Sequence, residues 1–294
     1  MFSYLVKISN PGALLAGFLL YGLGVAIAKY LSVEINSSAY VFGQICVTML
    51  QLSRYYLKAT YDLPAERDPR AALGAGSEET SLTRTKLLLL SFTTLTIGAV
   101  FTVLLFTYHW VNWPVFIIIA ASFLLMFLYA VPPFRLVYSG YGELISAFFM
   151  ANLVPGIGFL LQAGDFHRLL AMITFPITAL YLALELAFSL EHYQALAKGS
   201  ARSMMERFGW QTGMFFHNVM ILFGYLLIGV AALSGMPLSL VIPGLVSLPL
   251  GFFQIWQISQ IGGGAKPHWR LLRLTAAATV GLTAYLFAFS LWTH

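Results

Sequence analysis

Residues 51–68 read QLSRYYLKATYDLPAERD, and at this point a long apolar run of the chain passes abruptly into a dense group of charged side chains, residues 58–68. The contrast is informative because only 9% of the 294 residues are charged, whereas 59% are hydrophobic. Soluble domains carry about a quarter charged residues. The composition therefore predicts an integral membrane protein in which this charged stretch forms a loop at one end of a membrane span.

Nine segments are apolar enough to cross a bilayer, which takes about 20 residues in a helix. Because lipid offers the backbone no hydrogen-bond partners, such segments are expected to be helical. The predicted fold class is therefore all-α, a polytopic membrane protein with nine transmembrane helices. The expected spans are residues 12–31, 37–57, 87–107, 113–131, 144–162, 169–190, 213–233, 238–258 and 271–292.

The distribution of basic residues predicts the orientation of these spans. Every Lys and Arg except Lys29 and Arg168 falls on the side of the amino terminus. The positive-inside rule makes that side cytoplasmic and the side of the carboxyl terminus external. All six tryptophans lie near expected span ends, as interfacial aromatic residues do. This topology explains the net charge of +5, so no nucleic-acid partner is predicted.

The sequence gives no indication of an intrachain disulfide, a zinc site or a cleaved signal peptide. The single cysteine, Cys46, cannot form an intrachain disulfide, and no Cys/His cluster indicates zinc. The first apolar segment is followed by many others, so it is interpreted as a retained span and not as a cleaved signal peptide.

Two long polar loops, residues 58–86 and 191–212, follow the second and the sixth expected span. This layout predicts a single transmembrane domain over residues 1–294 that contains two similar four-helix units. The first unit is expected over residues 1–131 and the second over 132–258, with a ninth helix at 259–294.

Polar residues recur at steps of three, four or seven in two of the spans, which places them on one face of each helix. Both polar faces end on the predicted cytoplasmic side, so they are expected to line a central polar cavity open to the cytoplasm. In the second span these residues are Gln44, Gln51, Arg54 or Tyr55, Lys58 and Asp62; in the sixth they are Tyr181, Glu185, Ser189 and His192.

Glu185 lies within the apolar run LYLALELAFSLEH. An acidic side chain at the centre of a membrane helix costs about 2.5–3.5 kcal/mol. One interpretation is a protonated glutamate that hydrogen-bonds a neighbouring helix. The other is a ligand or gate in a wet cavity, and Asp62 at a matching depth favours it.

The charged loop offers donors for a metal ion and for phosphate. The carboxylates of Asp62, Glu66 and Asp68 are hard oxygen ligands of the kind that bind Mg²⁺ together with a phosphate group. Basic side chains nearby could hold phosphate oxygens directly. The alternative is an ordinary solvated loop of mixed charge.

The segment LYAVPPFRLVYSGYGELISAFFMANLVPGIGFLLQAG, residues 128–164, resembles the UbiA superfamily of intramembrane prenyltransferases, and most closely the branch that prenylates dihydroxynaphthoate in menaquinone synthesis. Residues 51–68 resemble the first aspartate-rich motif of the same branch through Gln51, Asp62 and Asp68. The residues that carry the first resemblance are Tyr129, Pro132, Pro133, Arg135, Gly140, Gly142, Glu143, Gln162 and Gly164.

Both aspartate motifs are degenerate compared with the family pattern. Lys58 and Ala59 stand where the first motif has asparagine and aspartate. In the second motif, Glu191 or His192 stands in place of the first aspartate, and the second aspartate is missing. The end of that motif keeps the family's shape in Gly199, Arg202, Ser203, Arg207 and Gly209.

The resemblance implies a UbiA-like bundle in a bacterial-type inner (plasma) membrane, with Mg²⁺ as cofactor and a prenyl diphosphate and an aromatic acceptor as substrates. It implies catalytic roles for Asp62, Asp68 and Glu191, and magnesium ligation by Asp62, Glu66, Asp68, Glu185 and Glu191. The implied diphosphate-binding residues are Arg54, Lys58, Arg67, Lys198 and Arg202. Those implied near the acceptor or cavity are Gln51, Glu143, Asn152, Glu185 and His192.

The implied function is Mg²⁺-dependent transfer of a prenyl group to an aromatic quinone precursor such as dihydroxynaphthoate. One alternative is a catalytically degenerate member of the family that binds an isoprenoid or quinone as a subunit of a membrane complex. A third hypothesis is a transporter that uses the same cavity, with its glutamates as proton or ion sites.

Overall fold

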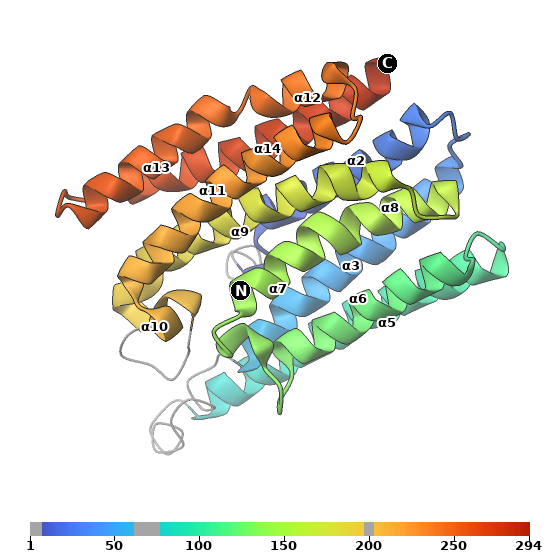
Figure 1. The fold of residues 1–294 in the computed structure, drawn as a ribbon. Helices are drawn as coiled ribbons and strands as arrows, with labels where there is room; N and C mark the ends of the chain where they lie inside the picture. Colours follow the sequence, from blue (N-terminus) through green and yellow to red (C-terminus); the bar gives the residue numbers. More distant parts are fainter. Residues whose placement is uncertain (1–7, 62–76, 197–202) are drawn as a thin grey trace.

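The computed structural model describes residues 8–61, 77–196 and 203–294 (Figure 1). Part of the predicted site lies outside these ranges, namely Asp62, Glu66, Arg67, Asp68, Lys198 and Arg202. All regular elements of the described residues are helical, as the fold-class prediction requires.

The long helices coincide closely with the expected spans. The bounds are α2 Pro11–Tyr30, α3 Ser37–Tyr61, α5 Ser77–Thr107, α6 Trp113–Ala130, η2 Leu136–Tyr138, α7 Gly142–Phe148, η3 Phe149–Leu153, α8 Val154–Ala163, α9 Arg168–Leu196, α10 Met204–Phe208, α11 Trp210–Leu233, α12 Leu238–Leu245, α13 Leu248–Gly262 and α14 Trp269–Thr293.

Eight helical segments of the described chain are long and apolar enough to cross a membrane, so the chain is an integral membrane protein. The second expected span, 37–57, corresponds to α3, which has 25 residues but is not among these eight. Its polar side chains are directed into the protein, since Gln51 and Arg54 are 1% and 2% exposed. The count of nine membrane-crossing helices therefore stays a prediction.

Local sequence explains where several helices begin. Asn10 precedes Pro11, and its side chain accepts a hydrogen bond from the amide of Ala13 at 3.4 Å. Asn112 acts in the same way before α6 and accepts from the amide of Val115 at 3.2 Å. These side chains satisfy amides that the first helical turn leaves without a partner.

Two of the expected spans contain local irregularities. The segment Gly142–Ala163 includes the π-helical turn η3, directly before a proline at position 155 that has no amide hydrogen to donate. The expected span over 238–258 corresponds to the candidate span Leu238–Gly262, but it is not one continuous helix, because α12 ends at Leu245 and α13 begins at Leu248. Buried Ser247 at this break hydrogen-bonds Tyr225 of α11 at 2.9 Å and Thr283 of α14 at 2.5 Å.

The helices form two sides with a central layer between them (Figure 1). Helices α3, α5 and α6 lie on one side and α11–α14 on the other, with α2, α7–α8 and α9 in between. α3 packs on α5, α9 on α11, and α2 on α8, while α14 contacts both α2 and α9. The carboxyl terminus lies at the end of the bundle opposite α10.

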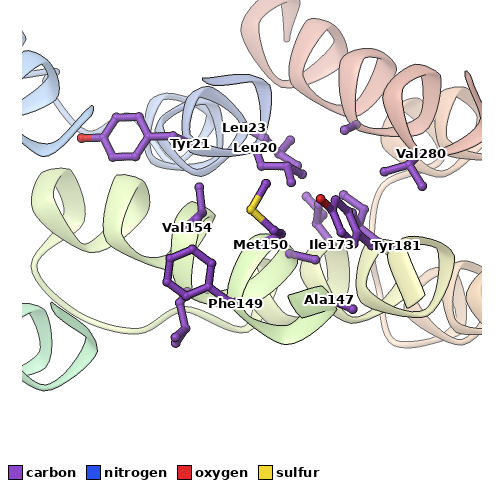
Figure 2. Packing of buried hydrophobic residues seen from close by; sticks show 14 of the residues in the cluster. Leu20, Tyr21, Leu23, Ala147, Phe149, Met150, Val154, Ile173, Tyr181 and Val280 are labelled. Atoms are coloured by element: carbon purple, nitrogen blue, oxygen red, sulfur yellow. The ribbon is translucent and has the colours of Figure 1, made fainter. Parts of the chain in front are cut away.

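Apolar side chains from the central helices fill the core. Figure 2 shows Met150 of η3 and Tyr181 of α9 packed among Leu20 and Leu23 of α2, near Val280 of α14. Because lipid is as apolar as these side chains, close packing and not the hydrophobic effect holds membrane helices together. Small residues at helix crossings are therefore important.

Gly24 and Gly22 of α2 provide a matched pair that tests this packing. A Cβ added to Gly24 would lie 1.9 Å from the carbonyl oxygen of Pro155 in α8, whereas one added to Gly22 would meet nothing within 4 Å. We expect Gly24→Ala to lower the free energy of unfolding by about 1–3 kcal/mol or more. Gly22→Ala should be neutral or stabilise by about 0.5–1 kcal/mol, because alanine is the better helix former. Unfolding of the purified variants in one detergent measures both, and equal behaviour would contradict the close α2–α8 contact.

Candidate functional site

The polar faces of α3 and α9 meet around a buried arginine. The Arg54 guanidinium lies over three aromatic rings, with its carbon 4.9 Å from the ring centre of Tyr55 and 5.1 Å from those of Tyr129 and Phe149. Ring faces attract cations, and the attraction is strongest where water is excluded. The guanidinium of Arg54 is thus surrounded by aromatic rings from α3, α6 and η3.

Hydrogen bonds connect this arginine to Glu185. Arg54 Nη2 donates to the Tyr55 hydroxyl at 3.0 Å, and Nη1 donates to Ser146 Oγ at 3.4 Å. Ser146 Oγ in turn donates to Glu185 Oε1 at 2.8 Å. The carboxylate therefore has a hydrogen-bond donor and a nearby cation, which offsets the cost of placing it in a membrane helix.

Lys58 lies one turn beyond Arg54 on the same face of α3 and is half-buried. It is close enough to Glu185 to attract the carboxylate electrostatically, and Glu143 is close enough to repel it. The structure thus gathers Arg54, Lys58, Glu143 and Glu185, all of them predicted site residues. We call these four residues and Ser146 the Arg54–Glu185 cluster.

Glu143 has a positioning role that the sequence did not reveal. Its carboxylate is buried and accepts hydrogen bonds from Ser189 Oγ at 2.7 Å and from the amide of Met204 at 3.1 Å. It thereby connects α7 to α9 and to the start of α10. Glu143 therefore contacts the chain just before Glu191, at Ser189, and within the stretch that resembles the end of the second motif, at Met204.

The loop between α6 and α7 joins the ends of α3 and α10. Arg135 Nη2 donates to the carbonyl of Tyr61, the last residue of α3, at 2.6 Å. Arg207 of α10 donates to the carbonyl of Ser139 at 2.7 Å and covers the Tyr141 ring at 4.3 Å. The loop between α6 and α7 therefore contacts both the end of α3 and α10.

Other predicted site residues have structural partners of their own. Gln51 is buried and donates to the sulfur of Met150 at 3.2 Å. Asn152 donates to Thr178 of α9 through a short hydrogen bond. His192 belongs to α9, and nothing further is described of its side chain.

Glu191 points toward α14, where its carboxylate pairs with Arg273 Nε at 3.2 Å. Sequence reasoning missed Arg273 because the two residues are far apart in the chain and no pattern relates them. It also missed Ser146, although Ser146 follows Glu143 by three residues on a helix and such residues share a face.

Gln162 lies at the other end of the bundle from this cluster. Its side-chain oxygen accepts from the amide of Asn36, before α3, at 2.8 Å. The nearby carbonyl of Gly164 accepts a hydrogen bond from Asn112. The Gln-x-Gly sequence therefore fixes loops between helices and does not contribute to the Arg54–Glu185 cluster.

The described residues do not form a metal site by themselves. No group of three or more His, Cys, Asp or Glu side chains in the described ranges could hold a metal ion. Glu143, Glu185 and Glu191 each have a hydrogen-bond or ion-pair partner. One feature does fit an anion: buried Arg54 Nε has no hydrogen-bond partner among the described residues. Three of the predicted metal ligands, Asp62, Glu66 and Asp68, lie outside the described residues.

Solved structures of known proteins share this helix arrangement. A UbiA homologue from Archaeoglobus fulgidus bound to GPP and Mg²⁺ superposes with a TM-score of 0.66 at 13% sequence identity, with 99% of each chain covered. A structure of digeranylgeranylglyceryl phosphate synthase matches with a TM-score of 0.67, also at 13% identity, over 96% of this chain and 94% of that one. The same A. fulgidus homologue bound to DMAPP and Mg²⁺ gives 0.63 at 12% identity, over 98% and 99% of the two chains.

Sequence comparison is less sensitive at this distance: no protein-family model matches the chain, and no curated protein matches its sequence. The structural match nevertheless covers nearly the whole length of each chain. This protein therefore has the fold of the UbiA prenyltransferases.

Proposed function

We propose that this protein transfers a prenyl group from an isoprenyl diphosphate to an aromatic acceptor within the membrane, with Mg²⁺ as cofactor. The observation that carries the proposal is the Arg54–Glu185 cluster. It joins a buried arginine and a half-buried lysine directly before the acidic stretch 62–68, in a chain with the UbiA fold. The A. fulgidus homologue of this fold is bound to GPP or DMAPP together with Mg²⁺.

In this proposal Asp62, Glu66 and Asp68 would hold Mg²⁺. When bound, the ion would neutralise charge on the departing diphosphate. Lys58 and Arg54 attract the diphosphate, and Arg54 Nε supplies a donor that has no hydrogen-bond partner among the described residues. Arg67, Lys198 and Arg202 are proposed as further diphosphate contacts.

Glu191 and Glu185 are proposed as ligands of a second Mg²⁺. Each would have to exchange its present partner, because Glu185 accepts from Ser146 and Glu191 pairs with Arg273. While Glu185 accepts the hydrogen bond from Ser146, it orients Ser146 and, through it, Arg54.

The proposed acceptor is an electron-rich aromatic ring, such as the quinone precursor dihydroxynaphthoate. Gln51, Asn152 and His192 are proposed to lie near the acceptor or the cavity. The apolar core around Met150 and Tyr181 excludes water from the neighbourhood of the cluster, which protects an allylic cation from hydrolysis.

The proposal is tested by incubating the purified protein with labelled geranylgeranyl or farnesyl diphosphate, Mg²⁺ and a panel of aromatic acceptors. We expect a prenylated product from at least one acceptor, with one diphosphate released per product and no reaction in EDTA. Diphosphate release that is insensitive to EDTA, or product formation without release, would contradict the proposed chemistry.

A catalytically degenerate isoprenoid- or quinone-binding subunit is the second candidate. It is favoured by one specific observation: the described carboxylates of the second polar face already have partners, and Lys58 occupies a position suited to a metal ligand. Such a protein would bind the labelled diphosphate without forming product.

We also propose that the amino terminus is cytoplasmic and the carboxyl terminus external, because Lys and Arg other than Lys29 and Arg168 gather on one side. A reporter enzyme that is active only on the external side of the membrane should be active when it is fused after His294. The same reporter inserted after Gly264, in the loop between α13 and α14, should be silent. Activity after Gly264 and none after His294 would contradict the proposed orientation and indicate the opposite one.

A further inference from the structure

A cavity of about 600 Å³ opens where the end of α9 meets the start of α14. Glu191, His268, Arg270 and Arg273 line it, and a second cavity of about 350 Å³ adjoins it through His268 and Leu271. The second cavity has Lys266, His268 and two glutamines, Gln257 and Gln260, in its lining, and its other side chains are apolar, including Trp256 and Ile261. A polar opening and an apolar slot thus lie side by side at one end of two membrane spans.

Basic residues greatly outnumber acidic ones around these two cavities. Lys266, His268, Arg270 and Arg273 lie within eight residues of the sequence, and all four are exposed. Residues 207–294 contain no aspartate or glutamate at all. Among the described residues that line the larger cavity, Glu191 alone is acidic.

The position relative to the bilayer limits what can bind there. α13 and α14 both belong to candidate membrane spans, and the basic residues lie at the connection between them. Clusters of basic residues between membrane helices attract anionic lipid headgroups, each residue contributing about 1 kcal/mol. Tryptophans such as Trp256 and Trp269 are typical of the interfacial layer where such headgroups lie.

We propose that the α13–α14 connection, together with Glu191, forms a binding site for an anionic phospholipid. The phosphate binds Arg270 and Arg273, with Lys266 and His268 at its edge. An acyl chain occupies the apolar slot beside Trp256, Ile261 and Leu271. The phosphate competes with Glu191 for Arg273, whose side chain is 44% exposed and therefore accessible to a lipid.

The test uses the full-length protein in detergent, titrated with phosphatidylglycerol or with phosphatidylcholine of identical acyl chains, and native mass spectrometry counts the bound lipid. The wild type should prefer phosphatidylglycerol by at least about tenfold. Since each basic residue contributes about fivefold, Arg270→Gln with Arg273→Gln should weaken phosphatidylglycerol binding by about 25-fold. Arg168→Gln, which removes an exposed arginine at the other end of α9, should change nothing.

Glu191→Gln provides a test of opposite sign. Removing the competing carboxylate should strengthen phosphatidylglycerol binding by up to about fivefold, the value of an exposed ion pair. Equal binding of the two lipids by the wild type, or weaker binding by Glu191→Gln, would overturn the proposal. So would displacement of the lipid by inorganic phosphate at similar concentration, which would indicate a site for the free ion.

Discussion

Replacing Asp62 with alanine is expected to lower the rate of prenyl transfer by at least about 100-fold, the usual cost of removing one preorganised group that stabilises transition-state charge. Asp62 follows directly on Tyr61, the last residue of α3, whose carbonyl is held by Arg135. The proposal assigns to Asp62 a ligand position on Mg²⁺. Asp68→Ala should have a similar effect, and both variants should require more Mg²⁺ for half-maximal rate.

The control for this prediction is Asp165→Ala. Asp165 is an exposed aspartate in the loop between α8 and α9, at the far end of α9 from Glu191. The Asp165→Ala variant should transfer the prenyl group at the full rate. A lower rate in the Asp62 and Asp68 variants would then reflect the position of the aspartate and not the change in net charge. Wild-type-like transfer by Asp62→Ala, in protein that elutes and unfolds normally, would remove Asp62 from the mechanism.

The second large effect is expected on stability. Arg54→Leu should lower the free energy of unfolding by about 3–5 kcal/mol, the cost of leaving one partner of a buried charged pair behind. Arg54 is 2% exposed and reaches Glu185 through Ser146, so its removal takes away the buried cation that hydrogen bonds connect to this carboxylate and leaves it the half-buried Lys58. Glu185→Leu should also lower the free energy of unfolding, because it leaves the Arg54 guanidinium buried without this carboxylate.

A double-mutant cycle separates this coupling from loss of packing. The variant with both Arg54→Leu and Glu185→Leu should be destabilised by clearly less than the sum of the two single changes, with a coupling energy of about 1–3 kcal/mol. Arg168→Leu, at an exposed arginine, should change stability by less than about 1 kcal/mol. Strict additivity in the cycle would mean that the two side chains stabilise the fold independently.

Much of the site could be predicted because helical periodicity is a strong signal in an apolar chain. Arg54, Lys58 and Glu185 stand out as polar residues on spans where charge is costly, and spacing alone places Arg54 and Lys58 on one face. In the structure, Ser146 connects Arg54 to Glu185, and Lys58 lies one turn beyond Arg54 on the same helix. Asp62, Glu66 and Asp68 lie outside the described residues, and their role remains a prediction.

Other features could not be obtained from periodicity. The contact between Glu191 and Arg273 joins α9 to α14, and no local pattern carries such a long-range pairing. The hydrogen bonds of Glu143 to Ser189 and to the Met204 amide likewise join residues far apart in the chain, while its predicted place near the acceptor or cavity stays a prediction. At the break between α12 and α13, the Ser247 hydroxyl hydrogen-bonds Tyr225 of α11 and Thr283 of α14, which are long-range contacts that no local pattern reveals.

The central claim is that the acidic stretch after α3 binds a prenyl diphosphate through Mg²⁺ beside the Arg54–Glu185 cluster. The most direct measurement is a structure of the protein with Mg²⁺ and a non-reactive prenyl thiodiphosphate. The account predicts carboxylate oxygens of Asp62 and Asp68 at about 2.0–2.1 Å from a magnesium ion that also contacts the diphosphate. A diphosphate bound away from Lys58, with no carboxylate of residues 62–68 on its metal ion, would contradict it.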